Sequence, residues 1–508
     1  MGMLSRACSA VLLFACIVGL AERADAAGVE DSVTGAEAIG RSANYVRAND
    51  ALAVWQNPAN LAIVPGKELT VELRMSAFHG CFDRARDPNI AAANGYLANE
   101  SFDEVCNDGG PQFAGTLGFA MALPRGFGFG VGLFTPGGGR KTEYGSDAIN
   151  TLFPASNEAV PVTSGARESP NRYLLLDRDV LAAFLMAGVG YQPNRFVRFG
   201  VSVGGGVVDI KYRNVTSVRG GTFADQEAVS DVKVVDAFVP RATLSAAVTP
   251  LDALDVMASF TWTDDIEAEG TVDVTANGFS QAPRGNCADA APGPRCRASD
   301  VTLKVPYQRF EAVLGARYAQ RRGARDRTID PLKDEVWDVE LNLYWSQTSH
   351  VKTYALDIYD PITERRGVAF NSAPGVSAIA LPATAAIPHN WKDTFGARLG
   401  GDWNVLAERL AVRLGVAYES RAVDPKNLTL DYWPLSRFTL SLGATVAVAN
   451  VRIHAGYAHV FQESVDVAVG EGNIREIAAI DAAAAQSVNE GSYDSSVDVF
   501  SLGANVRF

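Results

Sequence analysis

The sequence is short of the features that identify most membrane helices, metal centres and enzymes. Beyond its N-terminus, no apolar run reaches the roughly 18 to 20 residues that a transmembrane helix needs. Only 5 histidines occur, and no two cysteines have the C-x-x-C spacing of a zinc site. The net charge of −13 offers little to the phosphates of a nucleic acid. We therefore expect no helical membrane span, no metal or other cofactor, and no nucleic-acid partner.

The N-terminus has the three parts of an export signal. Arg6 supplies a positive charge, Ala10–Leu20 form an apolar segment, and Ala24-Asp25-Ala26 offers a cleavage site with small residues. We expect residues 1–26 to be a signal peptide that is removed on export. The mature chain then begins near Ala27.

Four cysteines follow this signal, an even number in a chain that is expected to be exported. Such cysteines usually form disulfides, and four of them allow three pairings. We favour Cys81–Cys106 and Cys287–Cys296, because each pair falls within one segment without strand alternation. A metal site is the weaker alternative, since His79 is the only histidine nearby.

The chain ends on a segment in which apolar and polar side chains alternate. In Phe500–Phe508 (F-S-L-G-A-N-V-R-F), every second residue is apolar and those between are small or polar. The same period of two occurs at 69–76, 337–345, 410–419 and 438–446. It predicts strands with one apolar and one polar face. Such strands suit a membrane barrel with lipid outside and a polar lumen, and equally a soluble sheet with one face in solvent.

The lengths of the connections decide between these two folds. Very short connections alternate with long ones, as in bacterial outer-membrane barrels with short turns at one rim and long loops at the other. We predict an all-β fold, a transmembrane antiparallel barrel of about 14 strands within residues 67–508. The expected strands are 67–78, 112–123, 126–136, 173–191, 196–213, 235–249, 253–268, 300–320, 332–349, 391–404, 408–420, 436–448, 450–462 and 495–508.

A barrel of this size has a lumen too wide for its own side chains to fill. Residues 27–66 precede the first expected strand and show no alternation. They mix apolar residues with amides in A-N-Y-V-R-A-N-D-A-L-A-V-W-Q-N-P-A-N-L-A. We expect this segment to be a partly helical plug, or hatch, inside the lumen. A disordered periplasmic tail is the alternative.

Three groups of motifs carry a resemblance to one family. They are Asn57-Pro58-Ala59-Asn60-Leu61-Ala62 preceded by Asn49-Asp50-Ala51, the glycine-rich segment 126–138, and the segments 393–400 and 410–420 with the closing strand. Together they resemble the FadL-type outer-membrane transporters of long-chain fatty acids and hydrocarbons, and the first group is similar to the N-terminal hatch of that family. The glycine-rich segment 126–138 is similar to its third strand. Its C-terminal half is similar to 393–400, 410–420 and the closing strand.

The resemblance implies passive uptake of long-chain fatty acids or related hydrophobic compounds across the bacterial outer membrane. A ligand is expected to be caught among extracellular loops, to pass to an internal pocket, and to leave sideways near an inward kink in the third strand. A sideways exit favours an apolar solute, because the solute moves into lipid rather than through water. The implied partners are this ligand, outer-membrane lipid and lipopolysaccharide, and the barrel assembly machinery during insertion. A monomer is expected.

Two groups of residues are candidates for moving parts. The hatch candidates are Asn49, Asp50, Trp55, Asn57, Pro58 and Ala59, of which the Asn57 amide is expected to bond to the barrel wall. The lateral-gate candidates are Gly126, Gly128, Gly130, Gly132 and Pro136. Glycines on the lumen face leave room for a plug or a ligand and weaken the strand, and the proline removes a hydrogen-bond donor. A strand pressed against the hatch without a gate is the alternative.

The alternation turns several arginines toward the lumen, where a fatty-acid carboxylate needs a cation for a charge-assisted hydrogen bond. The ligand-carboxylate candidates are Arg241, Arg317, Arg398 and Arg413, and Arg74 also faces inward. Acidic residues are expected on the same face, namely Glu72, Glu311, Asp402 and Glu419. Ion pairs that brace a wide barrel are therefore the favoured interpretation of these arginines.

Two long loops, 367–388 and Ile474–Val488, are unusually apolar, and either could form the first capture groove. The second is expected to contain a short alanine-rich helix. Two rival functions are a porin for small polar solutes and a surface protein whose barrel is only an anchor. An enzyme is not expected, because the one suggestive pair, His454 and Ser441, is a common coincidence in a barrel rich in serine and threonine.

Overall fold

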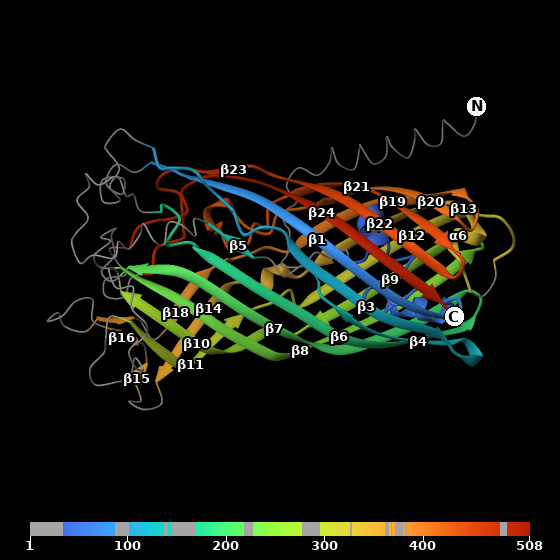
Figure 1. Ribbon diagram of the computed structural model, residues 1–508, viewed down its shortest axis with the longest axis horizontal. Coiled ribbons are helices and arrows are strands. Elements are labelled where there is room, and N and C mark those ends of the chain that lie inside the picture. The colour runs from blue at the N-terminus through green and yellow to red at the C-terminus, as the bar shows by residue number, and fades with distance from the viewer. Residues whose placement is uncertain are drawn as a thin grey trace.

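The chain forms one elongated β-barrel whose strands run obliquely along its long axis (Figure 1). The computed structural model describes residues 34–508 with gaps at 87–100, 137–140, 145–168, 218–226, 277–294, 326–327, 361–364, 367, 371–378, 382–383 and 478–484. The expected signal peptide, residues 1–26, lies outside the described residues. In the part of the chain that the structure describes, no helix has the length and apolarity of a membrane span.

Fourteen antiparallel strands form the barrel, which confirms the predicted fold class. The barrel closes where the first and last strands pair, from Glu68↔Arg507 to Arg84↔Gly491. Four of the strands consist of two segments separated by a break. The strands are β1 (Lys67–Arg84), β3 (Gln112–Ala122), β4 (Phe127–Phe134), β6 (Asp177–Asn194), β7 (Val197–Ser217), β8 (Glu227–Leu251), β9 (Leu254–Thr263) with β10 (Ile266–Ala276), β11 (Arg295–Val305) with β12 (Phe310–Arg321), β13 (Glu335–Ser346) with β14 (Thr353–Asp360), β18 (Thr384–Pro388) with β19 (Thr394–Leu406), β20 (Leu410–Glu419), β21 (Arg437–Val448), β22 (Val451–Gln462) and β24 (Gly491–Arg507).

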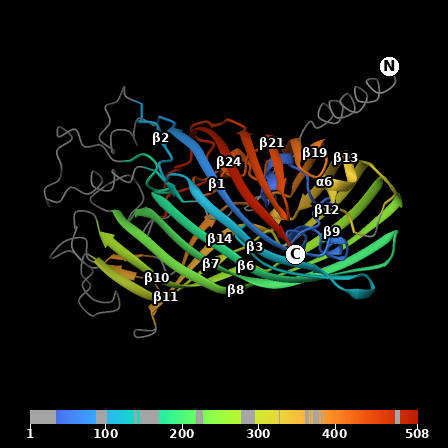
Figure 2. The same ribbon diagram turned by 45° about the vertical axis from the view of Figure 1, so that its right-hand side comes forward.

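Shorter elements lie inside the barrel and at its two ends. Before β1, the chain forms α2 (Ala36–Arg41), α3 (Ala53–Gln56) and η1 (Pro58–Ile63). The connections contain β2 (Val105–Cys106), η2 (Pro124–Gly126), β5 (Thr142–Glu143), α6 (Pro331–Asp334), η5 (Thr348–His350), β15 (Arg365–Arg366), β16 (Val368–Phe370), β17 (Ile379–Leu381), η6 (Pro425–Asn427) and β23 (Val465–Val467). In Figures 1 and 2, β2, β15 and β16 lie toward the end with the long connections, and α6 lies at the opposite end with the C-terminus.

Around the end that carries the short turns, the barrel has an apolar outside and a polar inside. On β1, the side chains of Glu72 and Arg74 are buried in the lumen, whereas those of Val71 and Leu73 are about half exposed. On β24, Leu502 is likewise exposed on the outer face. This alternation is the one seen in the sequence, and it gives the barrel the apolar outer band that lipid requires.

Toward the end with the long connections, the polarity of the two faces is reversed. On β10, Ile266, Ala268 and Val272 are buried inside the barrel, while Glu267 is exposed. On the outside of β6 and β7, exposed Asp179 and Lys211 form a 3.4 Å ion pair. Charged residues outside and apolar residues inside suit a part of the barrel that stands in water above the membrane.

This reversal explains where the strands differ from their predicted bounds. The structure extends β1 to Arg84, begins β8 at Glu227, continues β10 to Ala276 and begins β11 at Arg295. It also places β14 and β18 within a segment that was expected to be a loop. These extensions have an apolar inner face, so they lack the lipid-facing pattern that identified the membrane strands. In the expected helix Ile474–Val488, Arg475 and Ser487 form a β-bridge, and 478–484 lie outside the described residues.

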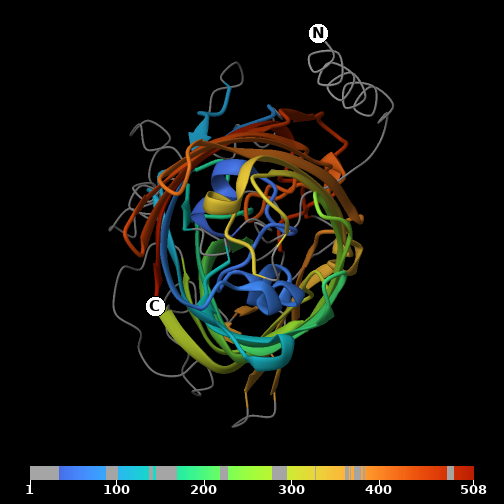
Figure 3. The same ribbon diagram turned by 90° about the vertical axis from the view of Figure 1, so that its right-hand side faces the viewer.

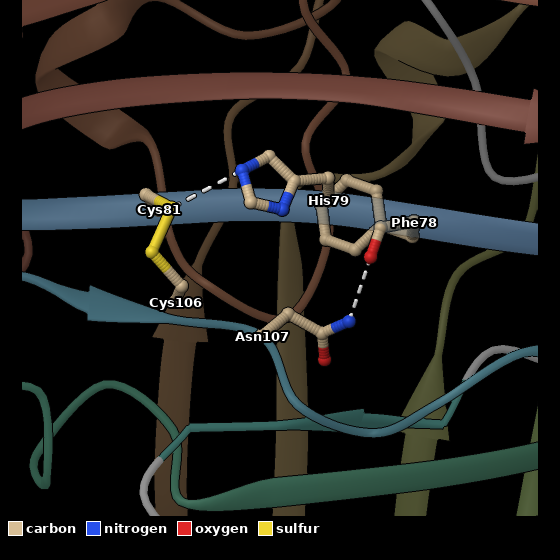
Figure 4. Close-up of a disulfide and its surroundings, with 5 residues drawn as sticks. All are labelled: Phe78, His79, Cys81, Cys106 and Asn107. Atoms are coloured by element: carbon tan, nitrogen blue, oxygen red, sulfur yellow. Dashed lines mark hydrogen bonds between the residues drawn. A yellow bond between two sulfur atoms is a disulfide. The ribbon is translucent and has the colours of Figure 1, made fainter.

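One of the two expected disulfides, Cys81–Cys106, is present and joins β1 to β2 (Figure 4). Cys81 lies on the extended part of β1 rather than in a loop, and Asn107 next to the bridge donates to the Phe78 carbonyl (2.8 Å). Cys296 lies on β11, and Cys287 lies outside the described residues. Among the described residues, the one cluster spaced like metal ligands contains both bridged cysteines, whose sulfurs offer no thiolate to a metal.

Candidate functional site

A large apolar cavity occupies the lumen in the upper half of the barrel, where the inner face is apolar. This main cavity encloses about 1270 Å³ of empty space, which includes its opening to solvent. Its walls come from β6, β7, β8, β10, β11, β14 and β18 and from the β20–β21 connection. Apolar lining residues include Val180, Ala182, Phe184, Val208, Ile210, Val232, Ile266, Leu303, Leu356 and Ile387. A cavity of this size and lining fits a hydrophobic small molecule.

The main cavity has one strongly polar end, built around Arg178 of β6. This side chain is buried, and its guanidinium lies 4.0 Å from the ring centre of Tyr432 and donates to the carbonyl oxygen of Asp431. Its Nε has no hydrogen-bond partner, and no described carboxylate lies within ion-pair distance of it. Arg178 is therefore a buried cation beside an apolar cavity without a counter-ion from the described residues. The alternation of the membrane strands did not reveal it, because Arg178 lies at the start of β6, above them.

The nearest carboxylate, that of Asp431, is occupied by other groups. It accepts hydrogen bonds from the backbone N–H of Tyr432 (2.8 Å) and from Thr429, and it lies 3.0 Å from Nε2 of His389. Burial alone would raise the pKa of Asp431, but the charge and hydrogen bond of His389, the hydrogen bond of Thr429 and the charge of Arg178 together hold the pKa below its usual value. Asp431 therefore interacts with Arg178 without an ion pair, and its carboxylate is hydrogen-bonded to other groups, which leaves the Arg178 guanidinium accessible to a ligand anion.

The hatch, here residues 34–66, lies in the lumen and reaches the main cavity through one of its lining residues, Phe184. Figure 3 looks along the barrel and shows this blue segment inside the ring of strands. The indole ring of Trp55 packs against Phe134 and Phe184, with ring centres 5.3 and 5.6 Å apart, and Phe184 also lines the cavity. Trp55 therefore connects the hatch to the base of the cavity.

The other hatch candidates hold the segment together or fix it to the wall. Asn49 donates to the carbonyl of Ile329, and the backbone N–H of Ala59 donates to Ser245 Oγ on β8 (2.8 Å). The Asn57 amide, expected to bond to the wall, instead donates to the carbonyl of Tyr45 within the hatch (2.9 Å). The reason is local: Asn57 caps the turn between α3 and η1, so its side chain faces the hatch backbone. Pro58 is the first residue of η1.

Glycines let the hatch backbone lie directly on the barrel wall. A Cβ at Gly128 on β4 would be 1.7 Å from the carbonyl oxygen of Leu61, and one at Gly200 on β7 would be 2.1 Å from the backbone of Pro58. On the opposite wall, a Cβ at Gly400 would be 1.8 Å from the carbonyl oxygen of Arg41. Any larger residue at these positions would displace the hatch.

The gate candidates divide into three kinds. Gly128, Gly130 and Gly132 face the lumen on β4, and the first two meet the hatch. Gly126 is not on the strand: it ends the tight η2 turn with a φ of +88°, a conformation that glycine adopts without strain. Pro136 is buried two residues after β4 ends. Through Phe134, β4 is paired with both neighbours, so the glycines themselves leave no opening in the ladder.

On one edge of β6, the hydrogen-bonded partner strand changes from β4 to β5 just above the end of β4. The last β4 pair is Phe134↔Phe184, and the next pair on that edge, Thr142↔Arg178, belongs to β5. Between them, residues 179–183 of β6 pair with β7 and with no other described strand. Val180 and Ala182 in this stretch line the main cavity. The cavity thus reaches the wall where β6 has a single described neighbour.

Buried ion pairs fasten the hatch to the wall formed by β13 and β19. Arg41 binds Asp338 and lies 3.5 Å from Asp402, and Arg47 lies 3.1 Å from Asp402. The carboxylate of Glu340 accepts from the backbone N–H of Arg47 (3.1 Å). All of these side chains are buried, so each carboxylate needs positive partners. The hatch arginines supply part of this compensation, and Arg317 and Arg413 of the wall supply the rest.

The four ligand-carboxylate candidates all lie buried in the lumen, in different settings. Arg317 binds two carboxylates of β13, and Arg413 binds one of β19 and one of the hatch, as in the ion-pair interpretation. Arg241 stacks on the ring of Trp55 at 4.0 Å. Arg398 lines a second, smaller cavity. None of the four lines the main cavity.

The suggested pair His454 and Ser441 does not form, because His454 contacts Thr445 (2.8 Å) and Ser441 contacts Ser42 of the hatch (2.7 Å).

The connection between β12 and β13, residues 322–334, crosses the end of the barrel below the hatch; Figure 3 shows this yellow segment over the mouth. We call it the strap. Its Asp330 binds Arg452 on β22 and Arg507 on β24, the latter at 2.7 Å. Its Ile329 accepts the hydrogen bond from Asn49 of the hatch. The strap is therefore fixed to the far wall and to the hatch.

The stability of the hatch in the lumen is expected to depend on pH through Asp50. Burial, and then the nearby carboxylate of Glu68, raise the pKa of Asp50 to about 7. A carboxyl group whose pKa is raised by folding stabilises the folded state at low pH, and that contribution is lost as the pH rises through the raised value. We expect a larger ionic leak in planar bilayers at about pH 8.5 than at about pH 5.5, and a smaller difference in Asp50→Asn. An unchanged difference in Asp50→Asn would contradict this assignment.

Comparison with known proteins gives one family and one fold. Residues 334–508 match the model of a family described as outer membrane protein transport protein (OMPP1/FadL/TodX). Among solved structures, a Pseudomonas aeruginosa FadL homologue has a TM-score of 0.66 at 15% identity, over 95% of this chain and 100% of that chain. The P. putida toluene transporter TodX gives 0.60 at 16%, over 95% and 99%, and the Ralstonia pickettii toluene transporter TbuX gives 0.53 at 15%, over 90% and 94%. At these identities the similarity shows a shared fold. No curated protein matches the sequence.

Proposed function

We propose that this chain, whose residues 334–508 match the OMPP1/FadL/TodX family of outer-membrane transport proteins, takes up long-chain fatty acids or related hydrophobic compounds. Members of this family are channels for hydrophobic compounds and not enzymes. The observation that carries the proposal is the main cavity, an apolar space inside a barrel whose membrane part has a polar lumen. Burial of each ligand methylene there contributes about 0.8 kcal/mol.

The way out of the main cavity is sideways in this proposal. Straight passage to the far end is opposed by the hatch and by the strap, which are bound to each other through Asn49. The stretch of β6 with one described neighbour supports an exit between β6 and the end of β4, next to Val180 and Ala182. An apolar ligand that leaves here enters lipid without losing its apolar surroundings.

Equilibrium binding of radiolabelled oleate to the purified, detergent-solubilised protein tests the proposed function. We expect saturable binding that unlabelled oleate displaces, and loss of growth on oleate when the gene is deleted. Absence of saturable binding, together with large steady ionic currents in planar bilayers, would overturn the proposal in favour of a porin. Unaffected growth on oleate would favour a surface protein with a barrel anchor.

The position of Arg178 beside the main cavity leads to a prediction about the head group of the ligand. We expect Arg178→Gln to weaken oleate binding about 10- to 100-fold, because a hydrogen bond to a charged group contributes about 1.5 to 3 kcal/mol. Binding of a neutral hydrocarbon such as toluene should change little. The exposed Arg195 provides a matched control, and Arg195→Gln should bind oleate as the wild type does. Equal losses for oleate and toluene would show that Arg178 only shapes the cavity.

A further inference from the structure

A second cavity lies on the opposite wall of the lumen, above α2 of the hatch. It contains about 540 Å³ of empty space, which includes its opening to solvent, and it shares no lining residue with the main cavity. Its hollow follows from small side chains on neighbouring strands, since Ala417, Thr439 and Ser441 face the lumen beside Arg398. Ile39 and Ser42 of the hatch line it from below.

Arg398 is the unusual member of this cavity. It is only 3% exposed, and its guanidinium lies 4.3 Å from the ring centre of Tyr344. It makes no hydrogen bond or ion pair with any described residue. The carboxylate that lines the same cavity, Glu419, is already bound by Arg437 (2.8 and 2.9 Å) and by the hydroxyl of Tyr344. A buried cation beside an empty space and without its own anion indicates a place for an external one.

We propose that the second cavity binds a carboxylate or another small oxyanion, with Arg398 as its anchor. The planar guanidinium offers two parallel N–H groups that match the two oxygens of a carboxylate. Ser42 and Ser441 share one hydrogen bond of 2.7 Å, which leaves one O–H of the pair for a ligand oxygen. This site is separate from the proposed uptake cavity and does not depend on it.

The apolar part of the lining decides between organic and inorganic ligands. Ile39, Ala458, Val460 and Val499 face the same cavity. These side chains would bury the first methylenes of a short carboxylic acid, whereas inorganic phosphate would lose hydration against them without compensation. A short-chain carboxylate is therefore the expected occupant. Because Ile39 and Ser42 belong to the hatch, the bound carboxylate would connect the hatch to the wall at Arg398.

Calorimetric titration of the detergent-solubilised full chain with hexanoate, and separately with inorganic phosphate, tests this site. The measurements use Arg178→Gln as the background, which removes the head-group anchor of the main cavity. We expect hexanoate to bind once per chain, and the further change Arg398→Gln to weaken binding at least about tenfold. Arg398→Lys, which keeps the charge without the paired N–H groups, should recover part of the affinity.

Two controls separate the possible outcomes. Thermal unfolding of each variant shows whether Arg398→Gln still folds, and Arg398→Lys carries the test if it does not. Phosphate that binds in the same Arg398-dependent way, without hexanoate, would support an oxyanion site with an inorganic source. The proposal would be overturned if Arg398→Gln changed the affinity for neither hexanoate nor phosphate, or if neither compound bound. Oleate binding by Arg398→Gln with Arg178 intact reports separately on the main cavity.

Discussion

Ala182→Trp is expected to reduce oleate binding and uptake about a hundredfold. The side chain of Ala182 lines the main cavity on β6, and an indole there takes the place of several ligand methylenes. Excluding about four methylenes at about 0.8 kcal/mol each removes about 3 kcal/mol, which corresponds to about a hundredfold in affinity. Radiolabelled oleate binding to the purified protein and uptake by whole cells measure this effect.

The neighbouring residue supplies a matched control. Ala183 follows Ala182 on the same strand, so its side chain points to the opposite face of the barrel. Ala183→Trp should therefore assemble and bind oleate as the wild type does. If both tryptophans reduced binding equally, the loss would come from a disturbed β6 rather than from a filled cavity, and the assignment of the ligand to this cavity would fail.

Arg41→Met is expected to loosen the hatch and to raise the ionic leak of a nearly silent barrel. The substitution removes the only charge that Arg41 offers to the buried carboxylates Asp338 and Asp402. Breaking a buried ion pair costs about 3 to 5 kcal/mol when it leaves an uncompensated charge behind. Here Asp338 keeps Arg317, and Asp402 keeps Arg47 and Arg413, so we expect a loss below that range. Single-channel currents in planar bilayers measure the opening directly. Arg41→Lys, which keeps the positive charge, should leak less than Arg41→Met.

The strap makes the outcome of this experiment informative. Asp330 holds it to Arg452 and Arg507 independently of Arg41. We expect the full current only when Arg41→Met is combined with Asp330→Ala, because each barrier then loses its own ion pair. A combined variant that stays silent would mean that the hatch is held mainly by its contacts with the glycines and not by charge.

The membrane part of the fold could be predicted from the sequence because lipid imposes a simple rule. An outer face in contact with lipid must be apolar at every second residue, as in Val71 and Leu73 of β1 and in Leu502 of β24. The alternating short and long connections then gave the order and number of strands. The mixture of amides and apolar residues before β1 indicated a segment that would be enclosed, and residues 34–66 lie in the lumen.

The ligand cavity could not be predicted in this way, because it lies where the rule reverses. On β10 the apolar residues face inward and Glu267 faces outward, so the same period of two has the opposite meaning above the membrane. Two of the breaks within the strands, between β9 and β10 and between β18 and β19, also shift the inward face by one residue. Arg178 belongs to this upper region, so the alternation of the membrane strands does not identify it as a residue of the lumen. The contacts of the strap were missed because Asp330 meets Arg452 and Arg507 only across the closed barrel.

Photo-crosslinking with a fatty acid that carries a diazirine in mid-chain tests the central claim, that an apolar ligand occupies the lumen above the hatch. Neighbouring residues on the same strands report the two faces of the wall. Phe184 and Val208 line the main cavity, whereas Leu185 and Val207 lie on the outer surface. We predict label on Phe184 and Val208 that excess oleate prevents. Label confined to Leu185 and Val207, unaffected by oleate, would contradict the account.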